Sequence, residues 1–333
     1  MRLVQFVSST GRRRVGRVSE DGRSVEALNG FASVYELARS AARSGRPLTE
    51  LVGQGTVDES GSLADLLTSG RILAPLDHPD DPAHCLVTGT GLTHLGSAQA
   101  RDSMHQALQE DEAKLSDSMR MFRLGLDGGK PRPGEVGAAP EWFYKGDGSV
   151  VAAPSQPLIM PGFALDGGEE AEVAALYVID DAGHPCRVGY ALGNEFSDHV
   201  LERQNYLYLA HSKLRPCSFG PELLLGELPE DVRGTVSLLR GEDSVWQAEF
   251  SSGAANMSHS LANLEHHHFK YPLFRRPGDV HVHFLGAAVL SFSAGVQAEA
   301  GDVFQIQADP FGAPLRNPLA VAEDEGLVKI RAL

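Results

Sequence analysis

Three glutamates and one lysine in the middle of the chain have the residue types and spacing of a metal-dependent catalytic centre. Glu170 and Glu172 lie two residues apart in GGEEAEVAALYVI, and Glu195 and Lys213 follow further along. The apolar run 173–179, closed by the turn-forming sequence DDAG, predicts a strand, and residues two apart on a strand share a face. Two carboxylates on one face repel each other unless a hard cation lies between them, and oxygen ligands suit magnesium, calcium or manganese.

The alternative for such a pair is a solvated strand face. The neighbouring residues Ala171, Val173 and Ala175 are small and apolar, and the strand continues as a fully apolar run. A strand that is buried for most of its length keeps two carboxylates only if they are paired or ligated. The sequence CRVGYALGNE then predicts a returning strand, which would form a hairpin and bring Glu195 back toward the first pair.

Composition narrows the class of protein. The 333 residues include 44 acidic and 29 basic ones, a formal charge of −15, which disfavours nucleic acids and anionic membranes as partners. Three cysteines without C-x-x-C spacing suggest neither a disulfide framework nor a thiolate zinc site. The N-terminal sequence has the wrong length and order for a signal peptide, and no run is long enough to span a membrane. We therefore expect a soluble cytoplasmic protein.

The chain divides into two parts near residue 75, where LAPLDHPDDPAH predicts a linker. Residues 1–75 read as a small α/β domain: short alternating runs predict a sheet, and Ser33 with Glu36 forms a capping box before a helix that ends near Gly45. Residues 76–333 contain a stretch, 85–129, that begins as a strand and turns into a long polar-faced helical region. A second helical stretch at 202–214 and many strands follow. The strand-like runs are TVSLLR, SVWQAEF, DVHVHF, AVLSF and DVFQIQA. The predicted class is α+β, with a mostly β second domain.

Two further features have competing interpretations. The glycines of TGTGLTHLG follow a predicted strand, but His94 occupies the position of the third glycine of a dinucleotide-binding fingerprint, which disfavours that motif. His94 is either a general base or an ordinary loop histidine. The histidines at 266–268, 281 and 283 lack the spacing of a zinc site, and we expect them on a polar helix face or at a subunit contact.

Four stretches resemble motifs of the fumarylacetoacetate hydrolase superfamily, in register along the second two thirds of the chain. They are PEWFYKGDGSVV, GGEEAEVA, GYALGNEFSDH with HSKLRPCSFGPEL, and RRPGDVHVHF. Within that superfamily the spacings resemble the 2-keto-3-deoxy sugar-acid dehydratases of the arabinonate type. The resemblance implies a fumarylacetoacetate-hydrolase-like fold and a homodimer. It also implies the following roles: Glu170, Glu172 and Glu195 hold Mg2+, with Mn2+ as the alternative, Lys213 contacts a substrate oxygen, Glu141 handles protons, and His94 is a second candidate base.

The chain departs from the family pattern at two positions. Glu195 stands where the family usually has aspartate, and Ser97 stands three residues after His94, where the hydrolases have glutamate. The second departure favours dehydration over water activation. The expected function is the dehydration of a 2-keto-3-deoxy pentonate to 2,5-dioxopentanoate. Hydrolysis of a C–C bond in a 2,4-diketo acid is the first alternative, and non-catalytic binding of a sugar acid is the second.

Overall fold

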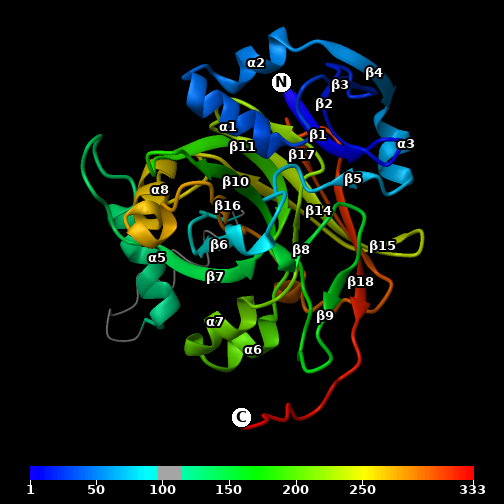
Figure 1. The fold of residues 1–333 in the computed structure, drawn as a ribbon. Helices are drawn as coiled ribbons and strands as arrows, with labels where there is room; N and C mark the ends of the chain where they lie inside the picture. Colours follow the sequence, from blue (N-terminus) through cyan, green and yellow to red (C-terminus); the bar gives the residue numbers. More distant parts are fainter. Residues whose placement is uncertain (97–114) are drawn as a thin grey trace.

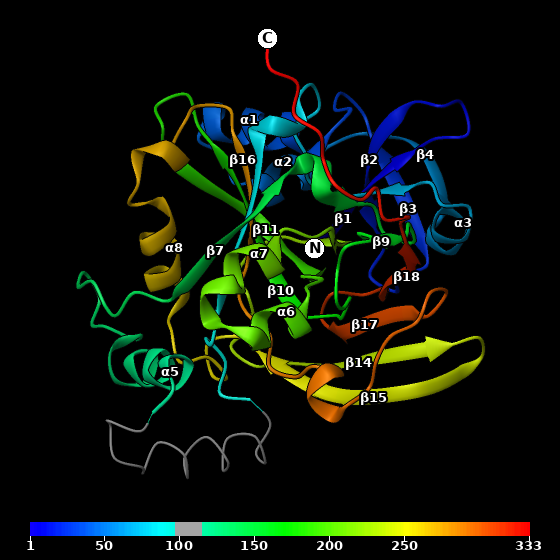
Figure 2. The ribbon, with the colours of Figure 1, turned by 90° about the horizontal axis from the view of Figure 1, so that it is seen from below.

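Two β-sheets form the body of the protein, with helices on the outside (Figures 1 and 2). The computed structural model describes residues 1–96 and 115–333. The large sheet contains β1 (Arg2–Val7), β2 (Arg13–Val18), β3 (Ser24–Leu28), β4 (Val57–Ser62), β5 (Ile72–Leu73), β6 (Cys85–Gly91), β7 (Glu141–Asp147), β8 (Val151–Ala152), β10 (Ala171–Ile179), β11 (Pro185–Asn194), β12 (Cys217–Phe219), β13 (Leu223–Leu224) and β16 (Val280–Phe284). The second sheet contains β9 (Leu158–Met160), β14 (Val232–Arg240), β15 (Asp243–Ser252), β17 (Val303–Asp309) and β18 (Leu315–Val321).

The helices are shorter and lie around these sheets. The α-helices are α1 (Val34–Ser44), α2 (Leu48–Gln54), α3 (Leu63–Thr68), α5 (Asp117–Gly128), α6 (His199–Gln204), α7 (Leu209–Lys213) and α8 (Leu261–Phe269). Single 3-10 turns occur at η1 (Pro82–His84), η3 (Gly148–Val150), η4 (Tyr206–Tyr208), η5 (Pro272–Phe274) and η6 (Phe292–Ala294). None of the helices in the described ranges is long and apolar enough to cross a membrane.

The hairpin of β10 and β11 is the centre of the fold and confirms the sequence prediction. β10 is buried along its whole length, and its alternate side chains enter two different clusters. Val173, Ala175 and Tyr177 pack with residues of β14 and β17, whereas Leu176 and Val178 pack with residues of α1 and β16. Because successive side chains of a strand point to opposite faces, β10 contributes to both hydrophobic cores. Packing on both faces fixes the position of this strand.

The N-terminal segment joins the large sheet through backbone pairing. β1 pairs with β2 on one side and with β13 on the other, in the register Leu3↔Leu223. The predicted helix start and end are confirmed at α1, where Ser33 accepts a hydrogen bond from the N–H of Glu36 at 3.1 Å and Gly45 ends the helix in the left-handed conformation. The capping box is incomplete, because the Glu36 carboxylate accepts from the N–H of Ala32 at 2.8 Å and not from that of Ser33. The domain boundary near residue 75 remains a proposal. The large sheet continues across it, because β1 of the N-terminal segment pairs with β13.

Two local predictions are wrong, and a third is tested only in part. The stretch 202–214 is not one helix: the side chain of Asn205 accepts a hydrogen bond from the N–H of Leu207 and separates α6 from η4 and α7. The run 288–292 is not a strand, because Glu169 accepts hydrogen bonds from both the N–H and the hydroxyl of Ser291 and holds this segment as a loop. The helical region predicted within 85–129 lies partly outside the described residues, and α5 is its described helix.

The histidines expected at the surface are largely buried. His281 and His283 lie on β16, which is paired with β10 on one side and β6 on the other. His268 from α8 bonds to His281 through Nε2 and Nδ1 at 2.9 Å, and His283 bonds to Thr88 at 2.8 Å. These rings are core residues because β16 is a central strand with both faces covered.

Candidate metal centre

The start of β10 and the end of β11 bring the three predicted glutamates together. Glu172 lies on β10, Glu170 immediately precedes it, and Glu195 follows the last residue of β11. The N–H of Glu195 donates to the carbonyl of Glu170 at 3.0 Å, and Gly168 and Ser197 exchange two backbone hydrogen bonds beyond it. One oxygen from each of the three carboxylates lies within 4.8 Å of the other two, and all three side chains are buried. The acids that the sequence singled out therefore form one cluster.

Lys213, the last residue of α7, places its ammonium group among these acids. Its Nζ donates to Glu170 Oε1, to Glu195 Oε2 at 2.7 Å and to Ser197 Oγ at 3.1 Å. Burial by itself would lower the pKa of Lys213, but the charges of Glu170 and Glu195 outweigh it and hold that pKa well above the ordinary value. Lys213 is therefore a fixed cation in the cluster.

A second buried lysine, which the sequence analysis did not single out, compensates Glu195 from the other side. Lys145 on β7 is fully buried, and its Nζ lies 2.5 Å from Glu195 Oε1. It also donates to the carbonyls of Phe196 at 2.6 Å and Lys213 at 3.1 Å. Lys145 stands four residues after Glu141, so the period of two along a strand was a signal that could have found it. Lys145 therefore connects β7 to the segment after β11 that carries Glu195 and to the end of α7 that carries Lys213.

Glu172 is the acid whose charge is left uncompensated. It accepts a hydrogen bond from the N–H of Gly286 at 2.7 Å, but it forms no ion pair within residues 1–96 and 115–333. Burial, together with the negative charges of Glu170 and Glu195, raises the pKa of Glu172 well above its ordinary value. A set of three carboxylates with one unbalanced charge fits a hard divalent cation such as Mg2+ or Mn2+.

His199 at the start of α6 is a further buried group beside the cluster that the sequence analysis did not assign. Its Nε2 lies 3.3 Å from Glu170 Oε1 and its Nδ1 lies 3.5 Å from Asp166 Oδ2. Burial lowers the pKa of His199, but hydrogen bonding to Asp166 and Glu170 raises it to about 10. The ring stacks on Phe292 with 5.3 Å between centroids, so His199 links Glu170 to the loop that Glu169 and Ser291 hold.

Glu141 at the start of β7 has the properties of a group that exchanges protons near neutral pH. Burial raises the pKa of Glu141 to about 7, against the opposing effects of the hydrogen bond from Tyr206 and the charge of Lys213. The Tyr206 hydroxyl donates to Glu141 Oε2 at 2.8 Å. Gly91 lies opposite Glu141 in the β6–β7 register, and a Cβ atom there would come within 1.8 Å of Glu141 Oε1. The absence of a side chain at Gly91 makes room for this carboxyl group.

His94, the other candidate base, has its hydrogen bonds elsewhere. Its Nδ1 lies 3.0 Å from Thr93 Oγ1 and its Nε2 lies 2.9 Å from Ser252 Oγ. Burial lowers the pKa of His94 to about 4, so the ring is neutral at physiological pH. His94 packs beside Gly286. The N–H of Gly286 donates to Glu172, so His94 contacts the acid cluster only indirectly. Ser97 lies outside the described residues.

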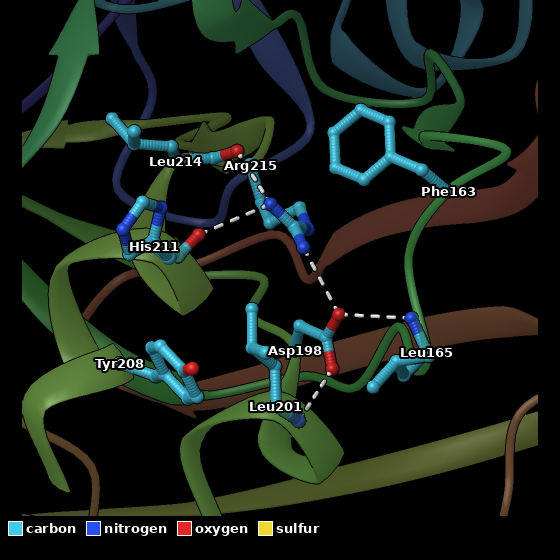
Figure 3. Close-up of a pocket in the computed structure, with 8 residues that line it drawn as sticks. All are labelled: Phe163, Leu165, Asp198, Leu201, Tyr208, His211, Leu214 and Arg215. Atoms are coloured by element: carbon cyan, nitrogen blue, oxygen red, sulfur yellow. Dashed lines mark hydrogen bonds and ion pairs between the residues drawn. The ribbon is translucent and has the colours of Figure 1, made fainter. Parts of the chain in front are cut away.

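An apolar pocket of about 460 Å³ lies beside α6 and α7 (Figure 3). Its lining includes a buried ion pair in which Arg215 Nη2 donates to Asp198 Oδ2 at 2.9 Å. Asp198 also accepts from the N–H groups of Leu165 at 3.0 Å and Leu201 at 2.9 Å, as Figure 3 shows. The same two helices that carry His199 and Lys213 therefore form one wall of this pocket.

Comparison with known proteins identifies the fold. No family model matches the chain, and no curated protein sequence does. Among solved structures, a 2-keto-3-deoxy-D-arabinonate dehydratase complexed with magnesium and 2,5-dioxopentanoate matches with a TM-score of 0.70 and 16% identity over 97% of this chain and 100% of that one. A 5-carboxymethyl-2-hydroxymuconate delta-isomerase from Mycobacterium smegmatis matches with a TM-score of 0.58 and 18% identity over 97% and 100%. A 2-hydroxyhepta-2,4-diene-1,7-dioate isomerase from Mycobacterium marinum matches with a TM-score of 0.57 and 17% identity over 98% and 100%.

These likenesses cover nearly the whole chain at low sequence identity, so they establish its architecture. The protein has the fold of the fumarylacetoacetate hydrolase superfamily, as the four sequence motifs predicted. The α+β class is likewise confirmed.

Proposed function

We propose that this protein is a magnesium-dependent dehydratase of 2-keto-3-deoxy sugar acids, which converts a pentonate to 2,5-dioxopentanoate. The observation that carries the proposal is the cluster of Glu170, Glu172 and Glu195 with Lys213 inside it. The fold supports it, because an arabinonate dehydratase shares that fold over almost all of both chains.

The three glutamates would hold the metal, with Mn2+ as the alternative to Mg2+. When bound, such a cation polarises the C2 carbonyl of a 2-keto acid and acidifies its C3 protons. Lys213 supplies a fixed positive charge next to the same carboxylates, where it would stabilise the negative charge that develops on the substrate. Lys145 is a positioning residue, because its ion pair with Glu195 Oε1 holds that carboxylate in place.

Glu141 is the favoured base for the C3 proton. With a pKa of about 7, about half of this group is ionised at neutral pH, which suits a residue that must both accept and return a proton. Glu141 takes the C3 proton, the C–O bond at C4 breaks, and the same proton leaves with the departing hydroxyl as water. The product of this elimination is a C3=C4 enone with a hydroxyl on C5. Transfer of a proton from C5 to C3 gives the C4=C5 enol, which tautomerises to the aldehyde at C5. His94 is less suited, since both of its ring nitrogens are engaged by Thr93 and Ser252.

Substitution of a proposed ligand tests this function. Glu170→Gln removes one charged ligand, and we expect it to abolish magnesium binding and turnover of 2-keto-3-deoxy pentonate. The matched control is Glu227→Gln, because Glu227 has an 85% exposed side chain and should leave both properties unchanged. If Glu170→Gln kept its metal and full turnover, the proposed centre would be wrong.

Hydrolysis of a 2,4-diketo acid is a second candidate, because the same carboxylate cluster could bind that substrate and the shared fold also occurs in enzymes of other reactions. This reaction needs an activated water, for which the neutral ring of His94 is a candidate base. Release of pyruvate with a carboxylic acid from an acylpyruvate would favour it. Tight binding of a keto acid without any turnover would instead support a non-catalytic sugar-acid binding protein.

A further inference from the structure

The pocket beside α6 and α7 is bordered by large apolar side chains that the single chain leaves exposed. Phe163 is 69% exposed, Leu214 52% and Leu165 49%, and all three line the pocket together with Leu201 and other residues (Figure 3). The three glutamates of the metal cluster and Lys213 do not line it. The pocket is therefore a feature separate from the proposed catalytic centre.

The helices that form its wall are short and depend on packing for their stability. α6 has six residues and α7 has five, and helices of one or two turns depend on tertiary packing for their stability. α6 begins with His199 and α7 ends with Lys213, both of which contact Glu170. Whatever covers the outer face of these helices would also hold the catalytic lysine in place.

A second exposed apolar surface lies in the last residues of the described chain. Leu327 is 90% exposed, Ile330 89% and Val328 75%, although the chain as a whole is strongly acidic. This segment, residues 326–333, has no secondary structure and runs away from the body of the molecule (Figure 1). An apolar patch of this kind on a soluble surface marks an interaction site.

The two exposed surfaces lie next to each other. The backbone of Asp324 packs against Gly162, where a Cβ atom would come within 2.4 Å of the Asp324 nitrogen. Gly162 directly precedes Phe163 at the border of the pocket. Asp324 Oδ1 then accepts a hydrogen bond from the N–H of Gly326 at 2.9 Å, and Gly326 has a φ of +68°. The segment thus leaves the fold through a defined turn beside the pocket.

We infer that a second copy of this chain fills the pocket with its segment 326–333, and that the two copies exchange these segments reciprocally. Eight extended residues reach at most roughly 26–29 Å, so a two-fold axis near Phe163 would put each segment at the partner's pocket. Val328 and Ile330 lie two apart and share one face of an extended segment. Lys329 and Arg331 then lie on the other face, and their charges are opposite in sign to the net charge of the partner.

The occupant is a second copy because the single chain leaves both surfaces exposed, so that its own segment 326–333 does not cover its own pocket. Docking buries both apolar surfaces at once and braces α6 and α7 from outside. The inference does not depend on the proposed function, since it concerns the assembly of the protein and not its substrate.

Photo-cross-linking of the full chain tests this assembly. With benzoylphenylalanine in place of Ile330, irradiation should give a product of twice the chain mass on a denaturing gel, whose cross-linked peptide contains residues that line the pocket. Adding Val328→Asp or Phe163→Asp should reduce this product at least tenfold. The matched control is Val245→Asp, because Val245 is a 40% exposed valine on the β14–β15 hairpin and should leave the yield unchanged.

Three results would overturn the inference. These are a cross-link confined to a single chain, a cross-link to another surface, and a yield that Val328→Asp does not change. None of these readouts requires activity, so they remain decisive if the protein has a different substrate.

Discussion

The hydrogen bond from Tyr206 to Glu141 makes a specific prediction about the pH dependence of the reaction. The Tyr206 hydroxyl donates to Glu141 Oε2 at 2.8 Å and stabilises the ionised carboxylate. Its removal in Tyr206→Phe should therefore raise the pKa of Glu141 above its value of about 7. A hydrogen bond to a charged group contributes about 1.5–3 kcal/mol, and one pKa unit corresponds to about 1.4 kcal/mol. Because Tyr206 is partly exposed, we take the lower end, a shift of about one unit.

The assay is kcat/KM for 2-keto-3-deoxy pentonate between pH 5 and 10, which follows the ionisation of the free enzyme. For the wild type, kcat/KM should rise about tenfold per pH unit below a bend near pH 7 and then level off, because only ionised Glu141 accepts a proton. For Tyr206→Phe the bend should move up by about one unit. The variant should lose about tenfold in activity at pH 6 and almost nothing at pH 9.

The control for this shift is Tyr144→Phe. Tyr144 is exposed and lies on β7 with Glu141, but an odd number of residues away and so on the opposite face. Its removal should leave the bend unchanged. A Tyr206→Phe profile that bends at the wild-type pH, or at a lower one, would refute the assignment of Glu141 as the base.

Three other substitutions test the neighbouring parts of the centre. Gly91→Ala should displace the Glu141 carboxyl group, since a Cβ would lie 1.8 Å from Oε1. It should lower kcat about 100-fold and leave the circular dichroism spectrum unchanged. Full activity of this variant would contradict the placement of Glu141. In chelator, Glu172→Gln should melt at the same temperature as the wild type or a higher one, because it removes an unbalanced buried charge. With Mg2+ the variant should gain much less thermal stability than the wild type does. Equal stabilisation of both proteins by Mg2+ would exclude Glu172 as a ligand. Lys145→Met should lower the free energy of unfolding by about 3–5 kcal/mol, because it leaves the buried Glu195 without its partner. At about 0.7 kcal/mol per degree for a chain of this length, the melting temperature should fall by roughly 4–7 °C, whereas the exposed Lys270→Met should change it little. Equal melting temperatures for the two variants would contradict the ion pair.

Much of the centre could be predicted from local patterns in the sequence. The spacing of Glu170 and Glu172, the apolar run after them and the turn before the returning strand together indicated a buried hairpin with acids near one end. The hairpin is present as β10 and β11. Glu195 and Lys213 were placed near these acids, and both contacts exist. Local patterns succeeded here because the strand, its turn and its partner are consecutive in the chain.

The features that the sequence did not indicate are contacts between segments that are distant in the chain. Lys145 and His199 were missed because their partners, Glu195 and Glu170, lie far from them in the chain. His281 and His283 were expected at the surface, but the position of β16 between two other strands buries them. The strand predicted at 288–292 is a loop because the side chain of Glu169 binds Ser291, a contact that overrides the local preference for a strand.

The most direct test of the central claim is an NMR comparison of substrates with and without metal. Purified protein would be incubated with 2-keto-3-deoxy pentonate isomers and, separately, with an acylpyruvate, each in the presence of Mg2+ or of chelator. A dehydratase built on the carboxylates of Glu170, Glu172 and Glu195 should form 2,5-dioxopentanoate from one pentonate isomer, and chelator should abolish this product. Dehydration that continues unchanged in chelator, or pyruvate and a carboxylic acid from the acylpyruvate with no change in the pentonates, would contradict the account.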